Sequence, residues 1–373
     1  MKIVVNTRLL RANHMDGIGW FTYNTLKYIT ENNPAIEFHF LFDSDIDEKF
    51  LFSKNIVPHN LFPPAKHAIL NIVWFELSVR NYLKKVNPSL FLSPDGILCL
   101  GWNGKQYGVI HDINFAHIPA DLKWANRRFY NYFFPKYASK ASRLATVSEY
   151  SKNDIVKTFG TAPGKIDVVY CGINSFYKPV GEEIKRQVKE KYSGGAEFFV
   201  FVGTLHPRKN IIRLLQAFET FKQAVPSNAK LLLIGREMFR TQEMHDFRNT
   251  MRNKDDVIFT GQLPVEELKI VFASALCLTF VPYFEGFGIP PIEAMQCDVP
   301  VIASNATSIP EVVADAALIV DPYNINDIAN AMQRIWLEPL LRQELITKGR
   351  IRKLAFPWDR TSKLLWESIT KVL

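Results

Sequence analysis

The sequence predicts an α/β protein built from two doubly wound domains. Short apolar, β-branched runs alternate with amphipathic stretches along the chain, and most runs end in a turn signal. Continuous apolar strands between helices are typical of parallel sheets that helices cover on both faces. The runs form two sets of about six, which indicates two such sheets. The chain has 373 residues, 47% of them hydrophobic, and is long enough to bury two separate cores.

The expected strands fall into two groups of similar size. In the first half of the chain they are 2–6, 38–42, 90–94, 107–111, 144–148 and 166–170. In the second half they are 198–203, 230–235, 256–261, 277–282, 300–304 and 317–321. Most are followed by a helical pattern, as in a strand–helix–strand unit.

A polar, glycine-punctuated segment at 172–195 separates the two groups and predicts a linker with a short helix. We expect an N-terminal domain at 1–173 and a C-terminal domain at 174–356. The last stretch, 357–373, predicts an amphipathic helix with four apolar residues on one face, namely Leu364, Leu365, Ile369 and Leu373.

The composition argues against several classes of protein. Charged residues make up 22% of the chain and no low-complexity tract occurs, which is not the composition of a disordered protein. No apolar stretch approaches the length of a membrane-spanning helix, and the apolar opening is too short for a signal peptide. We therefore expect a cytoplasmic protein.

Neither the cysteines nor the histidines have metal-ligand spacing. The four cysteines, which form no C-x-x-C pair and are expected to be buried reduced thiols, are Cys99, Cys171, Cys277 and Cys297. The net charge of +8 fits any anionic partner, whether nucleotide, phospholipid or nucleic acid. Nucleic acid ranks last, because no zinc-finger, RRM or helix-turn-helix pattern is present.

The strongest functional signal is the segment 282–296, PYFEGFGIPPIEAMQ, between an apolar strand and a helix. Gly286 and Gly288 allow a tight turn close to a ligand, and the positive end of the helix suits a diphosphate. Glu285 and Glu293 add two carboxylates, which suit the hydroxyls of a sugar and a ribose. Each acid alone is explained as well by the helix dipole or by solvation. The whole group indicates a nucleotide-sugar site.

A second signal is the loop that follows the strand ending at Gly203. It contains Arg208 and Lys209, and a helix is expected to begin near Asn210, a candidate N-cap residue. Adjacent cations on a strand-to-helix loop can neutralise the charge that develops on a leaving diphosphate. A solvated surface pair is the alternative, and the position at the strand end favours the functional reading.

Two weaker signals lie in the first half of the chain. Gly17 and Gly19 precede a helix, but the full G-x-G-x-x-G fingerprint is missing, so an ordinary turn explains them nearly as well. His111 and Asp112 end an apolar strand at the edge where sites form, although a lone histidine is more often structural.

Together these motifs resemble the retaining glycosyltransferases of family 4, which have the GT-B fold of two Rossmann-like domains facing each other across a crevice. The resemblance covers nearly the whole chain and is more specific in the second half. It rests on the E-x(7)-E pattern from Glu285 to Glu293, the GTLHPRKN loop, the glycine loop at 16–20, the His111–Asp112 pair, and the segments TVSEYSKNDI and SIPEVVADAALIVDP.

The resemblance implies a role for each matching residue. The second domain would bind the nucleotide and the first domain the acceptor. Glu293 would hold the ribose hydroxyls, and Glu285 would contact hydroxyls of the transferred sugar. Arg208 and Lys209 would bind the diphosphate. Further donor contacts would come from Gly203, Thr204, Gly286, Phe287, Gly288 and Ile289.

From the first domain, Gly17 and Gly19 would offer backbone N–H groups to the phosphate. His111 would contact the 6-hydroxyl of the sugar, and the helix at 357–373 would return to pack on this domain. Some relatives have an arginine where Thr204 stands here, so more of the phosphate charge would rest on Arg208 and its neighbour.

The resemblance also implies front-face displacement, in which the leaving phosphate takes the proton of the acceptor. We expect no metal and no cofactor beyond the nucleotide-sugar substrate. Asp43 and Asp45 have D-x-D spacing, but their acidic segment reads as a solvated loop. The donor leans toward GDP-mannose, and the acceptor toward a glycan or lipid-linked glycan in surface polysaccharide synthesis.

Three other activities are kept as alternatives. A Rossmann dehydrogenase needs the glycine fingerprint that is missing here. A non-catalytic nucleotide-sugar binder would be expected to have lost Glu285, Lys209 or His111, and all three are present. A sugar-nucleotide epimerase shares the two-domain architecture and would isomerise its substrate without an acceptor.

The segment 123–143 holds six basic residues, seven aromatic residues and no acid. This composition suits the surface of an anionic membrane and would place the protein peripherally at its inner face. A packed helix, with aromatics in the core and cations in water, explains the same composition.

Overall fold

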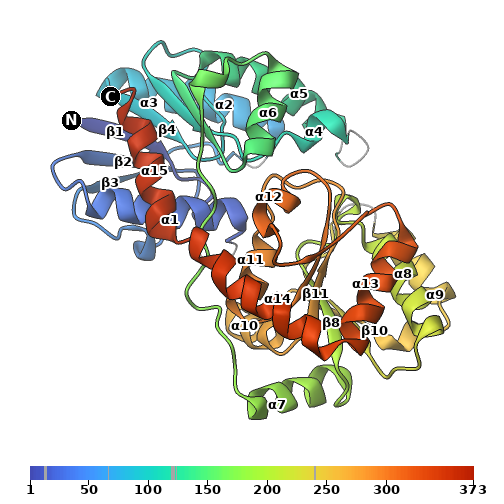
Figure 1. The fold of residues 1–373 in the computed structure, drawn as a ribbon. Helices are drawn as coiled ribbons and strands as arrows, with labels where there is room; N and C mark the ends of the chain where they lie inside the picture. The colour runs from blue at the N-terminus through green and yellow to red at the C-terminus, as the bar shows by residue number, and fades with distance from the viewer. Residues whose placement is uncertain (12–14, 66, 119–121, 123, 239–240) are drawn as a thin grey trace. The chain divides into compact units, whose positions relative to one another are not determined.

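The structure is a computed structural model that describes residues 1–11, 15–65, 67–118, 122, 124–238 and 241–373. Lys123 of the basic aromatic segment lies outside these ranges. The chain divides into two compact units (Figure 1). Unit 1 comprises Met1–Gly172 and Phe356–Leu373, and unit 2 comprises Ile173–Ala355. Each predicted domain boundary lies one residue from the boundary between these units.

Unit 1 contains a parallel sheet in the order β3-β2-β1-β4-β5-β6-β7. Its strands are β1 Lys2–Asn6, β2 Glu37–Phe42, β3 Ile56–Asn60, β4 Leu90–Ser93, β5 Gln106–Val109, β6 Arg143–Thr146 and β7 Ile166–Val168. The central strands are almost fully buried, as the continuous apolar runs predict for a sheet covered on both faces.

Helices connect these strands and cover both faces of the sheet (Figure 1). They are α1 Gly17–Glu31, η1 Glu48–Phe50, α2 Ala68–Val73, η2 Trp74–Val79, α3 Arg80–Val86, α4 Asn114–His117, α5 Trp124–Lys140, α6 Glu149–Phe159, η4 Pro163–Lys165 and α15 Trp358–Thr370. The segments α2, η2 and α3 follow one another directly, and the middle one is a π-helix.

Two features of unit 1 differ from the sequence prediction. The strand β3 was not expected, because its sequence IVPHN contains Pro58 and lacks an apolar run; edge strands tolerate such residues. The supposed solvated loop at Asp43 is wrong as well. Asp43 is buried directly after β2, where its carboxylate accepts a hydrogen bond from the Ala65 N–H (3.0 Å) and pairs with Arg11 (3.3 Å). It anchors the chain that leads toward α2.

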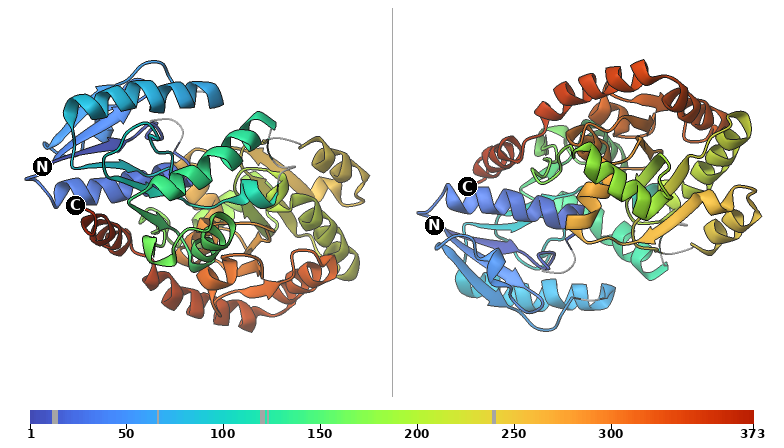
Figure 2. Two further views of the ribbon diagram at one scale, coloured as in Figure 1. Left: turned by 90° about the horizontal axis from the view of Figure 1, so that it is seen from above. Right: turned by 90° about the horizontal axis from the view of Figure 1, so that it is seen from below.

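The last helix, α15, belongs to unit 1 and packs across α1 (Figure 2). Leu365 and Ile369 are buried on its inner face. The Thr361 hydroxyl donates to the Tyr170 carbonyl (2.8 Å), and the Tyr107 hydroxyl of β5 donates to the Ser368 hydroxyl (2.5 Å). The final helix is therefore part of the core of the first unit, although the whole of unit 2 separates it in sequence from the rest of that unit.

Unit 2 contains a second parallel sheet in the order β10-β9-β8-β11-β12-β13. Its strands are β8 Phe198–Val202, β9 Lys230–Ile234, β10 Val257–Gly261, β11 Cys277–Phe280, β12 Val301–Ser304 and β13 Leu318–Val320. Its helices are α7 Glu182–Ser193, η5 Pro207–Lys209, α8 Ile211–Ala224, α9 Gln242–Thr250, η6 Lys254–Asp256, α10 Val265–Ala273, α11 Ile289–Gln296, α12 Ile309–Val313, α13 Ile325–Leu337, α14 Pro339–Arg352 and η7 Lys353–Ala355.

Each sheet has one point at which the strand order reverses. In unit 1 this point lies between β1 and β4, and in unit 2 between β8 and β11. Loops that leave the carboxyl ends of these two strands diverge to opposite faces of the sheet, which opens a crevice where ligands bind in doubly wound folds. The two reversal points are therefore the first places to look for function.

The helices and the cysteines bear on two further predictions. Within them, every helix is too short or too polar to cross a lipid bilayer. All four cysteines are buried and unpaired, as expected for structural thiols.

Candidate active site

The loop after β8 and the loop after β11 meet at the reversal point of unit 2. Pro207 begins the single turn η5, and the His206 ring accepts a hydrogen bond from the Arg208 N–H (3.4 Å) at its start. The Tyr283 N–H donates to the Arg208 carbonyl (3.1 Å), which ties the two loops together through their backbones. Arg208 and Lys209 are thereby held beside the chain that leads to Glu285.

A buried cluster of two cations and one carboxylate occupies this place. Both Lys209 Nζ and Arg208 NH1 contact the same oxygen, Glu285 Oε1, the latter at 2.9 Å. Lys209 and Glu285 are each only 7% exposed. The Arg208 guanidinium also donates to the Phe284 carbonyl (3.1 Å). The cluster has a net positive charge and lies where a ligand is expected.

Electrostatics keep Glu285 ionised. Burial opposes its ionisation, but the charges of Arg208 and Lys209 outweigh burial and hold the pKa of the Glu285 carboxyl below its ordinary value. Lys209 Nζ also lies 5.1 Å from the centre of the Phe280 ring, a favourable position for a cation. Glu285 is therefore ionised at neutral pH.

Two hydroxyl groups hold the backbone of the loop that carries Glu285. The Glu285 N–H donates to Thr307 Oγ1 (3.1 Å), and the Ser308 hydroxyl donates to the carbonyls of Glu285 (2.9 Å) and Phe287 (3.1 Å). Sequence reasoning assigned no role to Thr307 or Ser308, although Ser308 opens the segment SIPEVVADAALIVDP. The sequence signal for Ser308 was its place directly before a short helix, in the loop that follows a strand.

Asn210 does not cap α8 with its side chain, contrary to the prediction. It adopts a left-handed conformation with φ of 64°, and its amide donates to the carbonyls of Val281 (2.9 Å) and Pro322 (2.7 Å). Two backbone carbonyls that would otherwise be buried without donors accept these bonds, and this requirement outweighs the cap. Asn210 therefore joins three loops under the cluster.

Gly288 allows the turn into α11. It has φ of 96°, and a β-carbon on it would lie 2.5 Å from the Ile309 side chain. The predicted need for glycine is thus met at Gly288, whereas Gly286 has no positive φ. The helix begins at Ile289, followed by two prolines.

Glu293 lies on α11, away from the cation cluster. Burial raises the pKa of its carboxyl from 4.5 to about 8, although a hydrogen bond with the Tyr177 hydroxyl works in the opposite direction. The charge of Glu293 raises the pKa of Tyr177 and of Cys297, and neither Arg208 nor Lys209 is among the causes that shift the pKa of Glu293. The two predicted carboxylates therefore differ: Glu285 is charged at pH 7, and Glu293 is mostly protonated.

Gly203 and Thr204 lie at the mouth of the same loop. Gly203, with φ of 147°, directly follows β8, and its N–H donates to the Ile234 carbonyl (3.0 Å). Thr204 is exposed.

In unit 1, His111 lies two residues beyond the end of β5 and not within the strand as predicted. Its Nε2 donates to the Pro94 carbonyl (2.9 Å), and its ring meets the edge of Phe21 at 5.0 Å between centres. Burial lowers the pKa of His111. The ring is therefore neutral at pH 7, with the proton on Nε2 and a lone pair on Nδ1.

The predicted glycine loop begins α1 at Gly17. The Asp16 side chain caps this helix and accepts a hydrogen bond from the Gly19 N–H (2.8 Å). The N–H that the resemblance offers to a phosphate is thus already bonded, and only the N–H groups of Gly17 and Ile18 precede it in the first turn. A phosphate would compete with a carboxylate for Gly19.

The reversal point of unit 1 also holds a buried ion pair, which the sequence did not indicate. Arg8 Nε contacts Asp95 Oδ2 at 2.7 Å, and Arg8 NH1 donates to the Asn71 amide oxygen (3.1 Å). Asp95 Oδ1 accepts further bonds from the Asn6 amide (2.9 Å) and the Ser93 hydroxyl (2.9 Å). One cation and several neutral donors thus satisfy one carboxylate.

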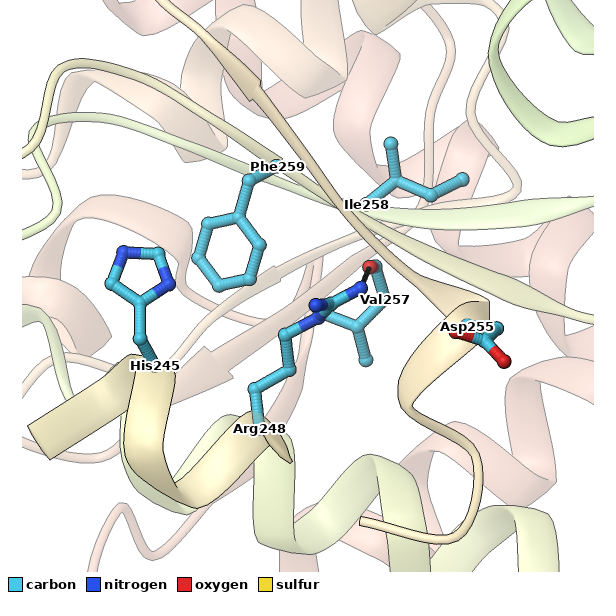
Figure 3. A pocket seen from close by; sticks show the side chains of 6 residues that line it. All are labelled: His245, Arg248, Asp255, Val257, Ile258 and Phe259. Atoms are coloured by element: carbon cyan, nitrogen blue, oxygen red, sulfur yellow. Dashed lines mark hydrogen bonds between the residues drawn. The ribbon is translucent and has the colours of Figure 1, made fainter. Parts of the chain in front are cut away.

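A shallow pocket of about 480 Å³ lies elsewhere in unit 2, between α9 and the edge strand β10 (Figure 3). The Arg248 guanidinium donates to the Val257 carbonyl (3.3 Å) and lies 5.9 Å from the centre of the Phe259 ring. Because β10 is two strands away from the reversal point, this pocket is separate from the cation cluster. Within the described ranges, no group of three or more histidine, cysteine or acidic side chains is arranged to hold a metal ion.

Two family models match the chain. Residues 182–352 match the glycosyl transferases group 1 model, and residues 15–175 match the glycosyltransferase family 4 model. The first match contains the whole cation cluster and Glu293. The second contains Gly17, Gly19 and His111.

The chain is similar to mannosyltransferases that build O-antigen chains. It is 28% identical over 250 residues to the O-antigen chain mannosyltransferase B of Escherichia coli. The aligned residues make up 67% of this chain and 66%, just under two thirds, of that protein. It is 26% identical over 328 residues to the O-antigen chain mannosyltransferase RfbU of Salmonella typhimurium, which is 86% of this chain and 87% of that protein.

Among solved structures, the sucrose-phosphate synthase of Thermosynechococcus elongatus is similar over 100% of this chain and 98% of its own, with a TM-score of 0.81 and 20% identity. At that identity the likeness concerns the fold. Two parallel α/β sheets in this arrangement of strands are the GT-B fold that the resemblance predicts.

Proposed function

This chain belongs to the family 4 glycosyltransferases of the group 1 type, and from that premise we propose that it transfers a mannosyl residue from GDP-mannose to a glycan or lipid-linked acceptor in surface polysaccharide assembly. The observation that supports the proposal most directly is the buried, cation-rich cluster of Arg208, Lys209 and Glu285 at the reversal point of unit 2. The choice of mannose rests on the two O-antigen mannosyltransferases that the chain resembles.

The cluster has the charge that a donor diphosphate requires. Two cations contact one carboxylate in this buried place, so the three side chains together carry a net positive charge. A diphosphate brings negative charge that complements it, and the guanidinium and ammonium donors suit phosphate oxygens. In the proposed complex Arg208 and Lys209 bind the diphosphate, and Glu285 turns to accept hydrogen bonds from hydroxyls of the transferred sugar.

Glu293 is proposed to bind the ribose. Its carboxyl is protonated over most of the physiological range because it is buried. Two vicinal hydroxyls that donate hydrogen bonds to the carboxylate would favour its ionised form. Nucleotide binding should therefore be coupled to the loss of a proton from Glu293.

The proposed reaction is a front-face displacement with retention of configuration. The bond from the anomeric carbon to the acceptor oxygen forms on the face from which the phosphate departs, while the bond to the phosphate oxygen breaks. The proton of the acceptor hydroxyl passes to that phosphate oxygen. Arg208 and Lys209 stabilise the negative charge that develops on the leaving group, so the mechanism needs no metal ion.

His111 is proposed to contact the transferred sugar. Its neutral ring holds its proton on Nε2 for the Pro94 carbonyl, which leaves Nδ1 as an acceptor. A sugar hydroxyl is a suitable donor for that lone pair. A charged histidine would instead repel a developing oxocarbenium ion.

A thermal-shift screen in the presence of EDTA tests the donor site. The ligands are GDP, UDP, ADP and their common sugar conjugates, and GDP and GDP-mannose are expected to raise the melting temperature most. Stabilisation by UDP or ADP alone would contradict the assignment of the base. No stabilisation by any ligand without metal would contradict the donor site itself.

A product assay separates transfer from isomerisation. With GDP-mannose and an O-antigen-type acceptor, we expect GDP release only when the acceptor is present, and an α-linked product by NMR. Conversion of the nucleotide sugar without acceptor would indicate an epimerase. A β-linked product would contradict retention.

A further inference from the structure

The outer face of α5 carries an alternating ladder of aromatic and basic side chains. Trp124, Arg128, Tyr132 and Lys136 follow one another at intervals of four residues and therefore share one stripe of the helix. The Arg128 guanidinium lies 5.1 Å from the centre of the Trp124 ring, and Lys136 Nζ lies 3.4 Å from the centre of the Tyr132 ring. The stripe is ordered by these cation–π contacts.

The core does not require this stripe. The opposite face of α5 is buried through Phe129, Phe134 and Tyr137, which pack into the core of unit 1. Trp124 is 69% exposed and Tyr132 is 60% exposed. The packed-helix interpretation of the basic aromatic segment therefore holds for the aromatics that form core, whereas Trp124 and Tyr132 remain on the surface. Arg143, the last basic residue of the segment, lies on β6 and pairs with Asp167.

Exposed aliphatic side chains lie on the neighbouring helix. The segment α2 packs against α5, and Ile69 on α2 and Leu77 on η2 are 74% and 55% exposed. Glu76 is the single acid between residues 68 and 86, and both of its oxygens are occupied by the N–H groups of Leu100 (2.6 Å) and Gly101 (2.8 Å). The Glu76 carboxylate is therefore bound by the backbone of the loop that contains Leu100 and Gly101.

We propose that these six side chains, which we name the docking surface (Ile69, Leu77, Trp124, Arg128, Tyr132 and Lys136), bind the surface of an anionic lipid bilayer. Tryptophan and tyrosine prefer the interface between headgroups and acyl chains, and basic residues beside them are attracted by anionic headgroups. Helix α5 itself has no acid to oppose that attraction.

The aliphatic members decide between a membrane and a glycan as the occupant. Exposed aromatic rings with cations also suit a polysaccharide, because sugars stack on rings. Isoleucine and leucine have no such use, but they gain free energy when they enter the acyl boundary of a bilayer. This inference rests on unit 1 alone, so it holds for any donor sugar.

Vesicle sedimentation of the full chain tests the proposal. Vesicles contain phosphatidylcholine alone or with roughly a third of anionic phosphatidylglycerol, a content at which each basic residue near the surface contributes measurably to binding. We expect binding to the anionic vesicles, with an apparent affinity at least about tenfold lower for phosphatidylcholine alone and lower still in high salt.

Two variants of the docking surface and two matched controls sharpen the test. Arg128→Glu with Lys136→Glu, and Trp124→Ser with Tyr132→Ser, should each reduce binding by about tenfold or more. The controls change exposed side chains in unit 2: Arg186→Glu with Lys191→Glu on α7, and Leu340→Ser with Ile351→Ser on α14. Both should bind as the unchanged protein does.

Several outcomes would overturn the docking surface. These are no sedimentation with anionic vesicles at low salt, equal binding to both vesicle types, and equal loss in the unit 2 controls. A polysaccharide that binds the unchanged protein but not the Trp124→Ser, Tyr132→Ser variant, while vesicles bind neither, would assign the surface to a glycan. Transfer to a short soluble acceptor should be unaffected in the charge-reversal variant, which separates failure of this proposal from failure of the proposed transfer. Unchanged melting temperatures confirm that the variants are folded.

Discussion

The two reversal points of the molecule hold the same kind of interaction with different charge balances. In unit 1, Arg8 and Asp95 form a buried one-to-one pair, and Asp95 also accepts from neutral donors. In unit 2, two cations converge on one oxygen of Glu285. Equivalent topology thus brings one cation to one carboxylate in unit 1 and two cations to one carboxylate in unit 2, an excess of one cation among those three side chains. The topology determines where a site can form, and the balance of cations and carboxylates there determines whether the site attracts an anion.

The largest effect should follow from removing that excess. Lys209→Met leaves Glu285 paired with Arg208 alone, so the cluster becomes neutral and loses its attraction for a developing negative charge. We expect the turnover number to fall about 100-fold or more in a steady-state assay, by analogy with removal of a preorganised charge-stabilising donor. Lys222→Met is the matched control, because Lys222 is a buried lysine of unit 2 that pairs with Asp256 away from the cluster. Turnover that drops equally in both variants would mean that the cluster has no special role.

The next effect concerns the ion pair of Arg8 and Asp95 in unit 1. Arg8→Met leaves the buried Asp95 charge without its cation, which should cost about 3 kcal/mol of unfolding free energy. Urea denaturation followed by circular dichroism measures this loss. Adding Asp95→Asn should restore part of it, because an amide is not charged. A stable Arg8→Met protein would show that the neutral donors around Asp95 suffice, and the comparison between the units would fail.

A third effect depends on pH and on Glu293. Its carboxyl has a raised pKa of about 8 in the folded protein, so its contribution to stability is fully present below pH 4.5 and is lost as the pH rises through 8. Each tenfold change in proton affinity corresponds to about 1.4 kcal/mol, and a rise from 4.5 to about 8 therefore sets an upper bound of about 5 kcal/mol.

Glu293→Gln cannot ionise and should flatten this dependence. Unfolding free energies at pH 5 and pH 9 should differ less in the variant than in the unchanged protein, and the variant should be the more stable one at pH 9. The same substitution should weaken GDP binding by calorimetry, because the amide cannot become a carboxylate. Equal slopes in the two proteins would contradict the buried, protonated state of Glu293.

The smallest effect concerns acid and His111. Burial lowers its pKa, so the stability it contributes is complete above its ordinary pKa of 6.5 and is lost as the pH falls below that value. Burial lowers the pKa of His59 as well, so the acid sensitivity of the unchanged protein does not come from His111 alone. The contribution of His111 is therefore read from the difference between the unchanged protein and a variant without it. The melting temperature of His111→Gln should fall less between pH 7 and pH 5 than that of the unchanged protein. A steeper fall would mean that His111 is charged when folded.

Strand positions and the place of the candidate site at the ends of β8 and β11 were predictable, whereas charge states and loop contacts were not. Twelve strands follow from continuous apolar runs, and β3 was missed because an edge strand needs no such run. The local sequence around Asp43 is acidic and predicts solvation, but its partners Arg11 and Ala65 come from other parts of the chain.

The same limit applies at the site. Arg208, Lys209 and Glu285 were identified by type and spacing, but their convergence on one oxygen requires two loops 76 residues apart. Glu285 and Glu293 look alike in sequence, and only their neighbours make one a charged group and the other a mostly protonated one. Gly19 is another example, since its N–H is taken by Asp16 only three residues before it.

The place of α15 in unit 1 has a consequence for synthesis of the chain on the ribosome. Unit 2 is continuous from Ile173 to Ala355, so all of its strands have emerged before α15 is made. Unit 1 lacks the partner of Tyr107 and a cover for α1 until Phe356–Leu373 have been translated. Nascent unit 1 therefore keeps apolar surface uncovered for as long as unit 2 takes to be synthesised, and a chaperone acting on this protein should engage its amino-terminal part for longest.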